Sequence, residues 1–174
     1  STTDSQSMSI ILHSISDFER ISDHAMDIVK SAQELHEKGL SFTDSAKAEI
    51  NTLCRAVMDI CDLTTKCFCA GDDKEAMHVE PLEEVIDALS KKIKENHIVR
   101  LQKGLCTIEM GFILEDVLTG LERISDHCSN VAIEMITIFD NDYNTHEYFK
   151  NFSPQKRASF NEEYEELLSN YQLG

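Results

Sequence analysis

The chain has 174 residues, about one domain in length and enough to bury a core. Its 41% hydrophobic and 28% charged residues, with only 2 prolines and 6 glycines, are typical of a largely helical protein. Because 32 Asp and Glu residues face 16 Lys and Arg, the net charge is −16. A field of that sign repels nucleic acid and anionic lipid and attracts cations or basic partners. No nucleic-acid partner is therefore expected.

Helix start and stop signals predict four long helices, over about residues 5–38, 43–70, 73–103 and 107–139. Glycines 39, 71 and 104 follow the first three helices, where a left-handed residue commonly ends a helix. Thr43 or Asp44 is the expected N-cap of the second helix, and Asp72 or Asp73 that of the third. Pro81 is expected to kink or break the third helix, because proline lacks a backbone donor.

The remaining segment predicts a loop at "DNDYNT" and a short final helix in "SPQKRASFNEEYEELLSNY", with Pro154 near its start. Nothing predicts a strand, so the expected fold class is all-α, an antiparallel helical bundle. No apolar run approaches the ~18 residues that span a membrane, so this piece is not expected to insert directly into one. The chain begins at "STTDSQSMSIILHS" without an initiator Met, which indicates a piece of a longer protein.

The six cysteines do not follow a disulfide or zinc pattern. No Cys-x-x-Cys pair is present, and "CFC" alone is weak evidence of a metal site. The expectation is a reducing environment in which the thiols act as small core residues. The basic residues in "SKKIK" and "VRLQK" are expected on a solvated face.

An internal repeat joins the first and fourth helices. The six residues "ERISDH" occur at 19–24 and again at 122–127. Each copy is in phase with an apolar stripe of 3.6-residue period, which predicts the core faces of the two helices. The stripes are Phe18, Ile21, Ala25, Ile28, Ala32 and Leu35, and Leu121, Ile124, Cys128, Val131, Met135 and Ile138. A core needs only apolar residues of suitable size, so repetition of the polar residues indicates a role beyond packing.

The polar part of the repeat contains a row of carboxylates. Glu19, Asp23 and Asp27 lie four residues apart, and therefore stack on the face opposite the core stripe. Like charges at this spacing repel, and Arg20 and Arg123 are the only nearby cations expected, both off the row. A solvated acidic face is the simpler interpretation, and an external cation is the alternative.

Two segments of the chain resemble PhoU-like proteins. "SIILHSISDFERISDHAMDI" and "GLCTIEMGFILEDVLTGLERISDHCSNVA" are similar to the two signature helices of that family. "ENHIVRLQKGLCTIEMGFILEDVLTGLERISDH" is similar to the cytoplasmic C-terminal PhoU-like tail of bacterial sodium/phosphate cotransporter family proteins. The resemblance implies repeated, spectrin-like three-helix bundles, with the first repeat incomplete. It places a PhoU-like bundle at 1–140, in which 1–39 is the last helix of the first repeat and 43–140 the second repeat; 141–174 lies outside it.

The resemblance also implies metal sites, because the family carries Glu/Asp-x-x-x-Asp motifs that can bind transition metals. In this chain those motifs fall on Glu19, Asp23 and Asp27, on Glu83 and Asp87, and on Glu122 and Asp126. Asn130 stands where Asp27 would repeat, which makes the second motif less anionic. Carboxylates suit Mg, and an adjacent His24 or His127 favours iron, zinc or nickel. The resemblance implies a capacity to bind metal ions at these motifs, whether or not a given site holds an ion.

The function that the resemblance implies is regulation, not catalysis. The chain would be a cytoplasmic regulatory domain of a cell-membrane protein, a sodium-dependent phosphate transporter, with the membrane-embedded portion of the same polypeptide as its partner. The alternative is a free-standing PhoU-type regulator of an ATP-driven phosphate transport system and its sensor kinase; a structural bundle without a ligand is a third possibility. The apolar "MSIIL" at 8–12 adds the expectation of a homodimer through the first helix.

The other candidate residues give no indication of catalytic activity. Glu75 and His78 form one Glu-x-x-His, whereas a ferritin-like di-iron site needs two facing each other. His13 and His97 are expected to be structural hydrogen-bonding residues. No serine or cysteine lies in a known catalytic motif, and no glycine-rich phosphate loop is present.

Overall fold

The chain is an all-α bundle, as predicted. The computed structural model describes residues 2–139 and 153–173, and these contain helices but no strand. The predicted loop at "DNDYNT" lies outside the described residues. The helices are α1 (Thr2–Glu37), α2 (Asp44–Ala70), α3 (Asp73–Ala76), α4 (Val79–Gln102), α5 (Ile108–Phe139) and α6 (Pro154–Asn170).

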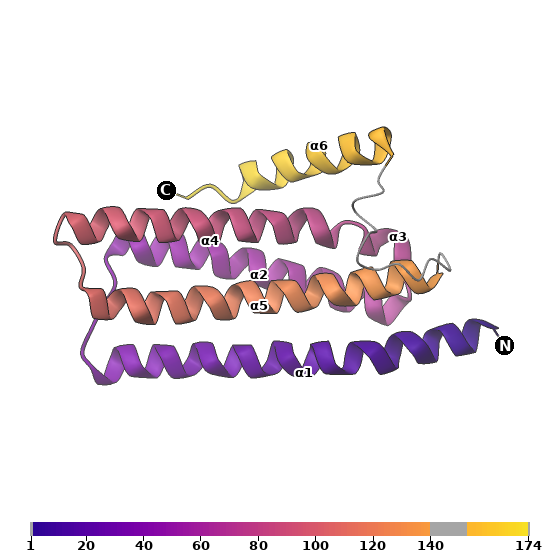
Figure 1. Cartoon of the computed structure of the whole chain (residues 1–174), viewed down its shortest axis with the longest axis horizontal. Coiled ribbons are helices and arrows are strands. Elements are labelled where there is room, and N and C mark those ends of the chain that lie inside the picture. The colour runs from indigo at the N-terminus through magenta and orange to yellow at the C-terminus, as the bar shows by residue number, and fades with distance from the viewer. Residues whose placement is uncertain (1, 140–152, 174) are drawn as a thin grey trace.

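The four long helices run up and down, each antiparallel to the one before it (Figure 1). α5 lies between α1 and α4, α2 packs behind α4 and α5, and α6 covers the outer side of α4 (Figure 1). α1 packs along α5 and makes only sparse contact with the other described helices. The arrangement places α4 and α5, which carry two of the three predicted acidic motifs, side by side.

The predicted helix ends are largely confirmed. Gly39, Gly71 and Gly104 all have φ between 63° and 68°, the left-handed conformation that glycine adopts without steric cost. The Thr43 hydroxyl caps α2 by accepting a hydrogen bond from the Ala46 backbone N–H at 3.2 Å.

The break in the third predicted helix does not occur at Pro81. The helix divides earlier, between the end of α3 at Ala76 and the start of α4 at Val79. Pro81 is the third residue of α4, within the first turn, where backbone N–H groups have no intrahelical acceptor. Proline therefore removes no helical hydrogen bond there, and the helix continues unbroken.

The core is formed mainly by α2, α4 and α5. Leu53, Ile60, Ile86, Ile93 and Leu118 are completely buried between them. The predicted stripe on α5 is confirmed. Its buried members are Leu121, Ile124, Cys128, Val131 and Met135, and Ile138 is partly buried. These side chains supply the apolar burial that stabilises the bundle.

The predicted stripe on α1 is only partly buried. Phe18, Ile21 and Ile28 pack against the core, but Ala25 and Ala32 are exposed. The predicted core face of α1 is therefore confirmed at Phe18, Ile21 and Ile28 but not at Ala25 and Ala32. Further exposed apolar side chains follow on the same helix: Met8, Ile11, Leu12, Ile15, Met26 and Val29.

A buried ion pair joins α2 to α4. Arg100 donates to both Glu49 oxygens, at 2.9 and 2.8 Å, and Asn96 Nδ2 donates to Glu49 Oε1 at 2.9 Å. Arg100 is 7% exposed and Glu49 3%. The predicted solvated face for "VRLQK" is therefore wrong at Arg100, because the guanidinium turns inward to its carboxylate partner.

Side-chain contacts hold α6 against the bundle. The Tyr171 hydroxyl, just after α6, donates to Asp59 Oδ2 on α2 at 2.6 Å, and the Arg55 guanidinium lies 5.5 Å from the centre of the Tyr171 ring. His78 Nδ1 lies 2.7 Å from Glu163 Oε1 of α6. His78 of the isolated Glu-x-x-His is thus part of the α6 contact. Within the described ranges, no helix is both long and apolar enough to cross a membrane.

Candidate metal site

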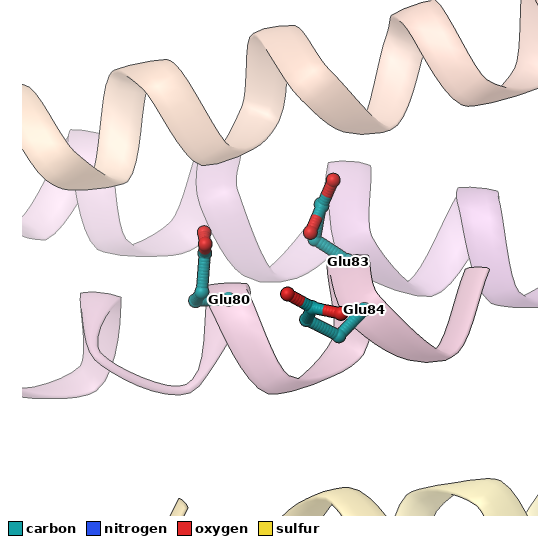
Figure 2. Close-up of side chains that lie close together, drawn as sticks. All are labelled: Glu80, Glu83 and Glu84. Atoms are coloured by element: carbon teal, nitrogen blue, oxygen red, sulfur yellow. The ribbon is translucent and has the colours of Figure 1, made fainter. Parts of the chain in front are cut away.

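Carboxylates from two of the predicted motifs meet between α4 and α5. Oxygen atoms of Glu83 and Asp87 on α4 and of Asp126 on α5 all lie within 4.8 Å of one another. A second group lies on the same part of α4: oxygen atoms of Glu80, Glu83 and Glu84 also lie within 4.8 Å of one another. Glu80 and Glu83 point from α4 toward α5, and the Glu84 carboxylate extends into the space between them (Figure 2). We call these five residues the carboxylate cluster.

The sequence of α4 produces this arrangement. Glu80 and Glu84 lie four residues apart, as do Glu83 and Asp87, so they form two adjacent rows on one side of the helix. Leu82, Val85 and Ile86 occupy the buried side and fix the rotation of the helix. The acidic rows consequently lie at the edge of the core, partly withdrawn from water.

Burial and mutual repulsion perturb these carboxyl groups. Burial, followed by the charges of Glu80 and Asp87, raises the pKa of Glu83 to about 8. Burial also raises the pKa of Glu80, and burial together with the Asp126 charge raises that of Asp87. Carboxylates that repel one another in a partly buried position are stabilised by a shared cation, which removes both the repulsion and the need for protons.

Polar side chains border the cluster around a depression of about 280 Å³. It is lined by Glu83, Arg123, Asp126, His127, Ser129 and Asn130. The Ser129 hydroxyl donates to Glu80, and Arg123 Nη1 lies 3.4 Å from Asp126 Oδ2. The cluster is therefore open to small ions while its side chains are partly held in place.

The histidines of the repeat lie beside the depression. His127 Nδ1 lies 2.8 Å from Asp17 Oδ1 on α1, and the His24 and His127 rings stack with centres 5.6 Å apart. A carboxylate that holds one imidazole nitrogen orients the ring, as in many metal proteins. Nε2 is then the His127 nitrogen that this contact leaves available.

The donor set fits a hard divalent or ferric cation. Glu83, Asp87 and Asp126 supply only oxygen, which suits Mg, Mn or iron, whereas His127 borders the depression outside the two carboxylate groups. Glu83 and Asp87 would hold the ion from α4 and Asp126 from α5.

Glu122, the other member of its motif, is engaged elsewhere. It accepts a hydrogen bond from Ser90 and lies 3.2 Å from the Lys94 ammonium group, which also pairs with Glu115. Of the motif on α5, only Asp126 therefore joins the carboxylate cluster.

The α1 row is exposed and lies outside any three-carboxylate group among the described residues. Asp27 pairs with Lys30 at 2.7 Å, so the expectation of a row without a local cation was wrong at this position. Metal binding by Glu19, Asp23 and Asp27 stays a prediction.

Sequence reasoning missed Glu80 and Glu84. The signal was present in "EPLEEVID", where both residues share the four-residue spacing of Glu83 and Asp87. Only the packing of α4 against α5 shows that Asp126 completes a group with Glu83 and Asp87 rather than with Glu122.

Comparison with known proteins gives a family-model match over part of the chain. Residues 50–135, which include the entire carboxylate cluster, match the family model described as the PhoU domain. This stretch of the all-α bundle is therefore similar to the PhoU domain.

The chain is also similar to a particular curated protein, the "Phosphate-specific transport system accessory protein PhoU homolog 1" of Thermotoga maritima. The two are 27% identical over 128 residues, which cover 74% of this chain and 54% of the relative. The chain thus spans about half the length of that relative. No solved structure matches the chain.

Proposed function

We propose that the chain is a non-enzymatic regulatory domain of phosphate transport, the cytoplasmic C-terminal tail of a sodium-dependent phosphate transporter in the cell membrane. The observation that carries the phosphate assignment is the PhoU-domain match over residues 50–135. The name of the Thermotoga relative, an accessory protein of phosphate-specific transport, supports the same process. The membrane-embedded part of the same polypeptide is the proposed partner, on the strength of the sequence resemblance at "ENHIVRLQKGLCTIEMGF".

The alternative is a free-standing PhoU-type regulator of an ATP-driven phosphate system and its sensor kinase. The relative's name favours this alternative as directly as the local resemblance favours the transporter tail. The encoding gene separates them, since hydrophobic spans upstream of residue 1 in the same reading frame support the tail.

Phosphate uptake by the source cells tests the function. Removal of the coding region for residues 1–174 is expected to change labelled-phosphate uptake, or its response to external phosphate, several-fold. If the change is confined to uptake that requires sodium, the tail is supported; if it is confined to sodium-independent uptake, the alternative is. Unchanged uptake across a range of phosphate concentrations would refute both.

We further propose that the carboxylate cluster binds a divalent or ferric ion that contributes to this regulation. A bound ion would join α4 to α5 and thereby make the stability of the bundle depend on ion concentration by mass action. Its binding, unlike the transport role, is measurable on the isolated protein.

Self-association through α1 is the last part of the proposal, with a second copy of the chain as the occupant of its exposed face. Met8, Ile11, Ile15, Met26 and Val29 are 46–57% exposed and fall within about 60° of the helix circumference. Their spacing is symmetric: in an antiparallel pair of α1 helices centred between residues 18 and 19, Met8 meets Val29 and Ile11 meets Met26. A two-fold interface requires such a self-complementary stripe.

We expect Ile15→Glu to convert a dimer into a monomer, because Ile15 is near the centre of this stripe and a buried unpaired charge is costly. Sedimentation equilibrium across a concentration series measures this change. Met58→Glu, at an exposed position on α2, is the matched control and should leave the dimer intact. Salt should strengthen association, since Glu19 and Asp23 flank the stripe and Glu19 would approach its own copy. A strict monomer would mean that another chain segment or protein covers this face.

A further inference from the structure

Two thiols from different helices touch in the interior of the bundle. Cys61 Sγ on α2 lies 3.8 Å from Cys128 Sγ on α5, although 67 positions separate them in the sequence. All six cysteines are free thiols, as the sequence predicted, and this is the one thiol–thiol contact within the described residues. The two sulfur atoms are already at van der Waals distance, so a covalent bond needs only a small approach.

The two thiols differ in accessibility. Cys61 is partly exposed, whereas Cys128 is 1% exposed. The hydrogen bond with Cys128 lowers the pKa of Cys61, while burial raises the pKa of Cys54 and of Cys67 on the same helix. Since the thiolate is the nucleophile, Cys61 is the reactive member of the pair and Cys128 the neighbour that can resolve it.

We propose that Cys61 and Cys128 form a peroxide-sensitive pair whose oxidation links α2 covalently to α5. The Cys61 thiolate attacks hydrogen peroxide, the O–O bond breaks, and after protonation of the leaving hydroxide the products are a Cys61 sulfenic acid and water. The Cys128 sulfur then attacks the sulfenic sulfur, which forms the S–S bond and releases a second water molecule that takes the Cys128 proton. In sum, two thiols are oxidised and one peroxide is reduced to two waters.

The distance that the two sulfur atoms must close is short. A disulfide is about 2.05 Å long, so the sulfur atoms must approach by less than about 2 Å. We expect rotation of the half-buried Cys61 side chain and a shift of the two helices to close this distance. Of the two other half-buried thiols, Cys54 and Cys106, Cys106 faces the His97 ring, with Sγ 3.8 Å from Nδ1.

The position of Cys128 gives the bond a consequence beyond a simple cross-link. Cys128 lies between His127, which contacts Asp17 on α1, and Ser129, which donates to Glu80 of the carboxylate cluster. A covalent bond at this turn would fix α5 against α2 at the level where α5 also contacts α1 and α4.

Mass spectrometry and thermal unfolding after peroxide treatment test the proposal. We expect one equivalent of hydrogen peroxide to remove the mass of two hydrogen atoms and to yield a Cys61–Cys128 peptide after digestion without reductant. The unfolding midpoint should rise by several degrees, because the cross-link closes a long loop, and should return after addition of dithiothreitol.

Variants separate this pair from the other thiols. Cys61→Ser and Cys128→Ala should each lose the cross-linked peptide and the shift in midpoint, and Cys69→Ser, at an exposed position on the same helix, should retain both. The cross-linked peptide is read in the unmodified chain, so a poorly folding variant does not obscure the result. Cysteine sulfinic acid without a disulfide, or a disulfide that joins other cysteines, would overturn the proposal.

Discussion

Arg100→Met is expected to lower the free energy of unfolding by about 3–5 kcal/mol, because it leaves the Glu49 carboxylate buried without its cationic partner. Glu49 is 3% exposed and Arg100 is 7% exposed, and Arg100 donates to both Glu49 oxygens. Asn96 alone would remain as a donor to that carboxylate. Urea denaturation followed by circular dichroism measures the loss as a shift of the midpoint at unchanged slope.

The double variant Glu49→Leu with Arg100→Met is the control for this effect. It removes both charges, so most of the stability lost in the single variant should return. Lys92→Met, at an exposed position on the same helix, should change stability by less than about 1 kcal/mol. If Arg100→Met proved as mild as Lys92→Met, the buried ion pair would not hold α2 to α4.

Glu83→Gln is expected to reduce cation affinity at the carboxylate cluster by tenfold or more, since Glu83 is the residue shared by both carboxylate groups. Isothermal titration with Mn²⁺ or Fe²⁺ measures the loss directly. Asp116→Asn, at an exposed position on α5, removes one negative charge away from the cluster and serves as the matched control. Equal affinities for the original chain and for Glu83→Gln would place any bound ion elsewhere.

The same variant should also change the pH dependence of stability without cations. The pKa of Glu83 is raised from its ordinary value of 4.5 to about 8, so the folded state holds a proton between these pH values that the unfolded state has released. Stability must therefore fall as pH rises through this window, by roughly 2 kcal/mol after allowance for solvent near a partly exposed group.

Glu83→Gln removes this titration, so the cation-free variant should be more stable than the original chain at pH 9 and should differ little at pH 4. Thermal unfolding in chelator-treated buffers at both pH values makes the comparison. Added Mn²⁺ should stabilise the original chain more at pH 8 than at pH 6, because the ion competes with the proton on Glu83. A flat pH profile for the original chain would contradict the raised pKa.

Local signals made the helices predictable. Helix ends depend on residues within a few positions, so they can be recognised from the sequence alone. The examples are the glycines at 39, 71 and 104 and the hydroxyl of Thr43. The apolar stripe on α5 was predictable for the same reason, since its period is independent of what covers it. The wrong predictions concern partners: Ala25 and Ala32 have the spacing of core positions, but α1 packs mainly on α5, which leaves these two residues exposed.

The candidate site was predictable only in its parts. The spacing of Glu83 with Asp87 indicates a shared helix face, but whether Asp126 or Glu122 approaches it depends on the relative rotation of α4 and α5. That rotation is set by packing of many core side chains at once. Glu49 with Arg100 shows the same limit, because a carboxylate and a guanidinium 51 positions apart carry no local sign that they will pair in the interior.

The attachment of α1 to α5 has a consequence for the order in which the chain can fold during synthesis. α2 and α4 each pack on a long helix made soon afterwards, but about a hundred residues separate the middle of α1 from the middle of α5. At ~5–20 residues per second, α1 leaves the ribosome roughly 5–20 s before its partner exists. During that interval α5 cannot cover the apolar face of α1, and we expect the acidic residues of the opposite face, Glu19, Asp23 and Asp27, to favour solvation of the nascent helix.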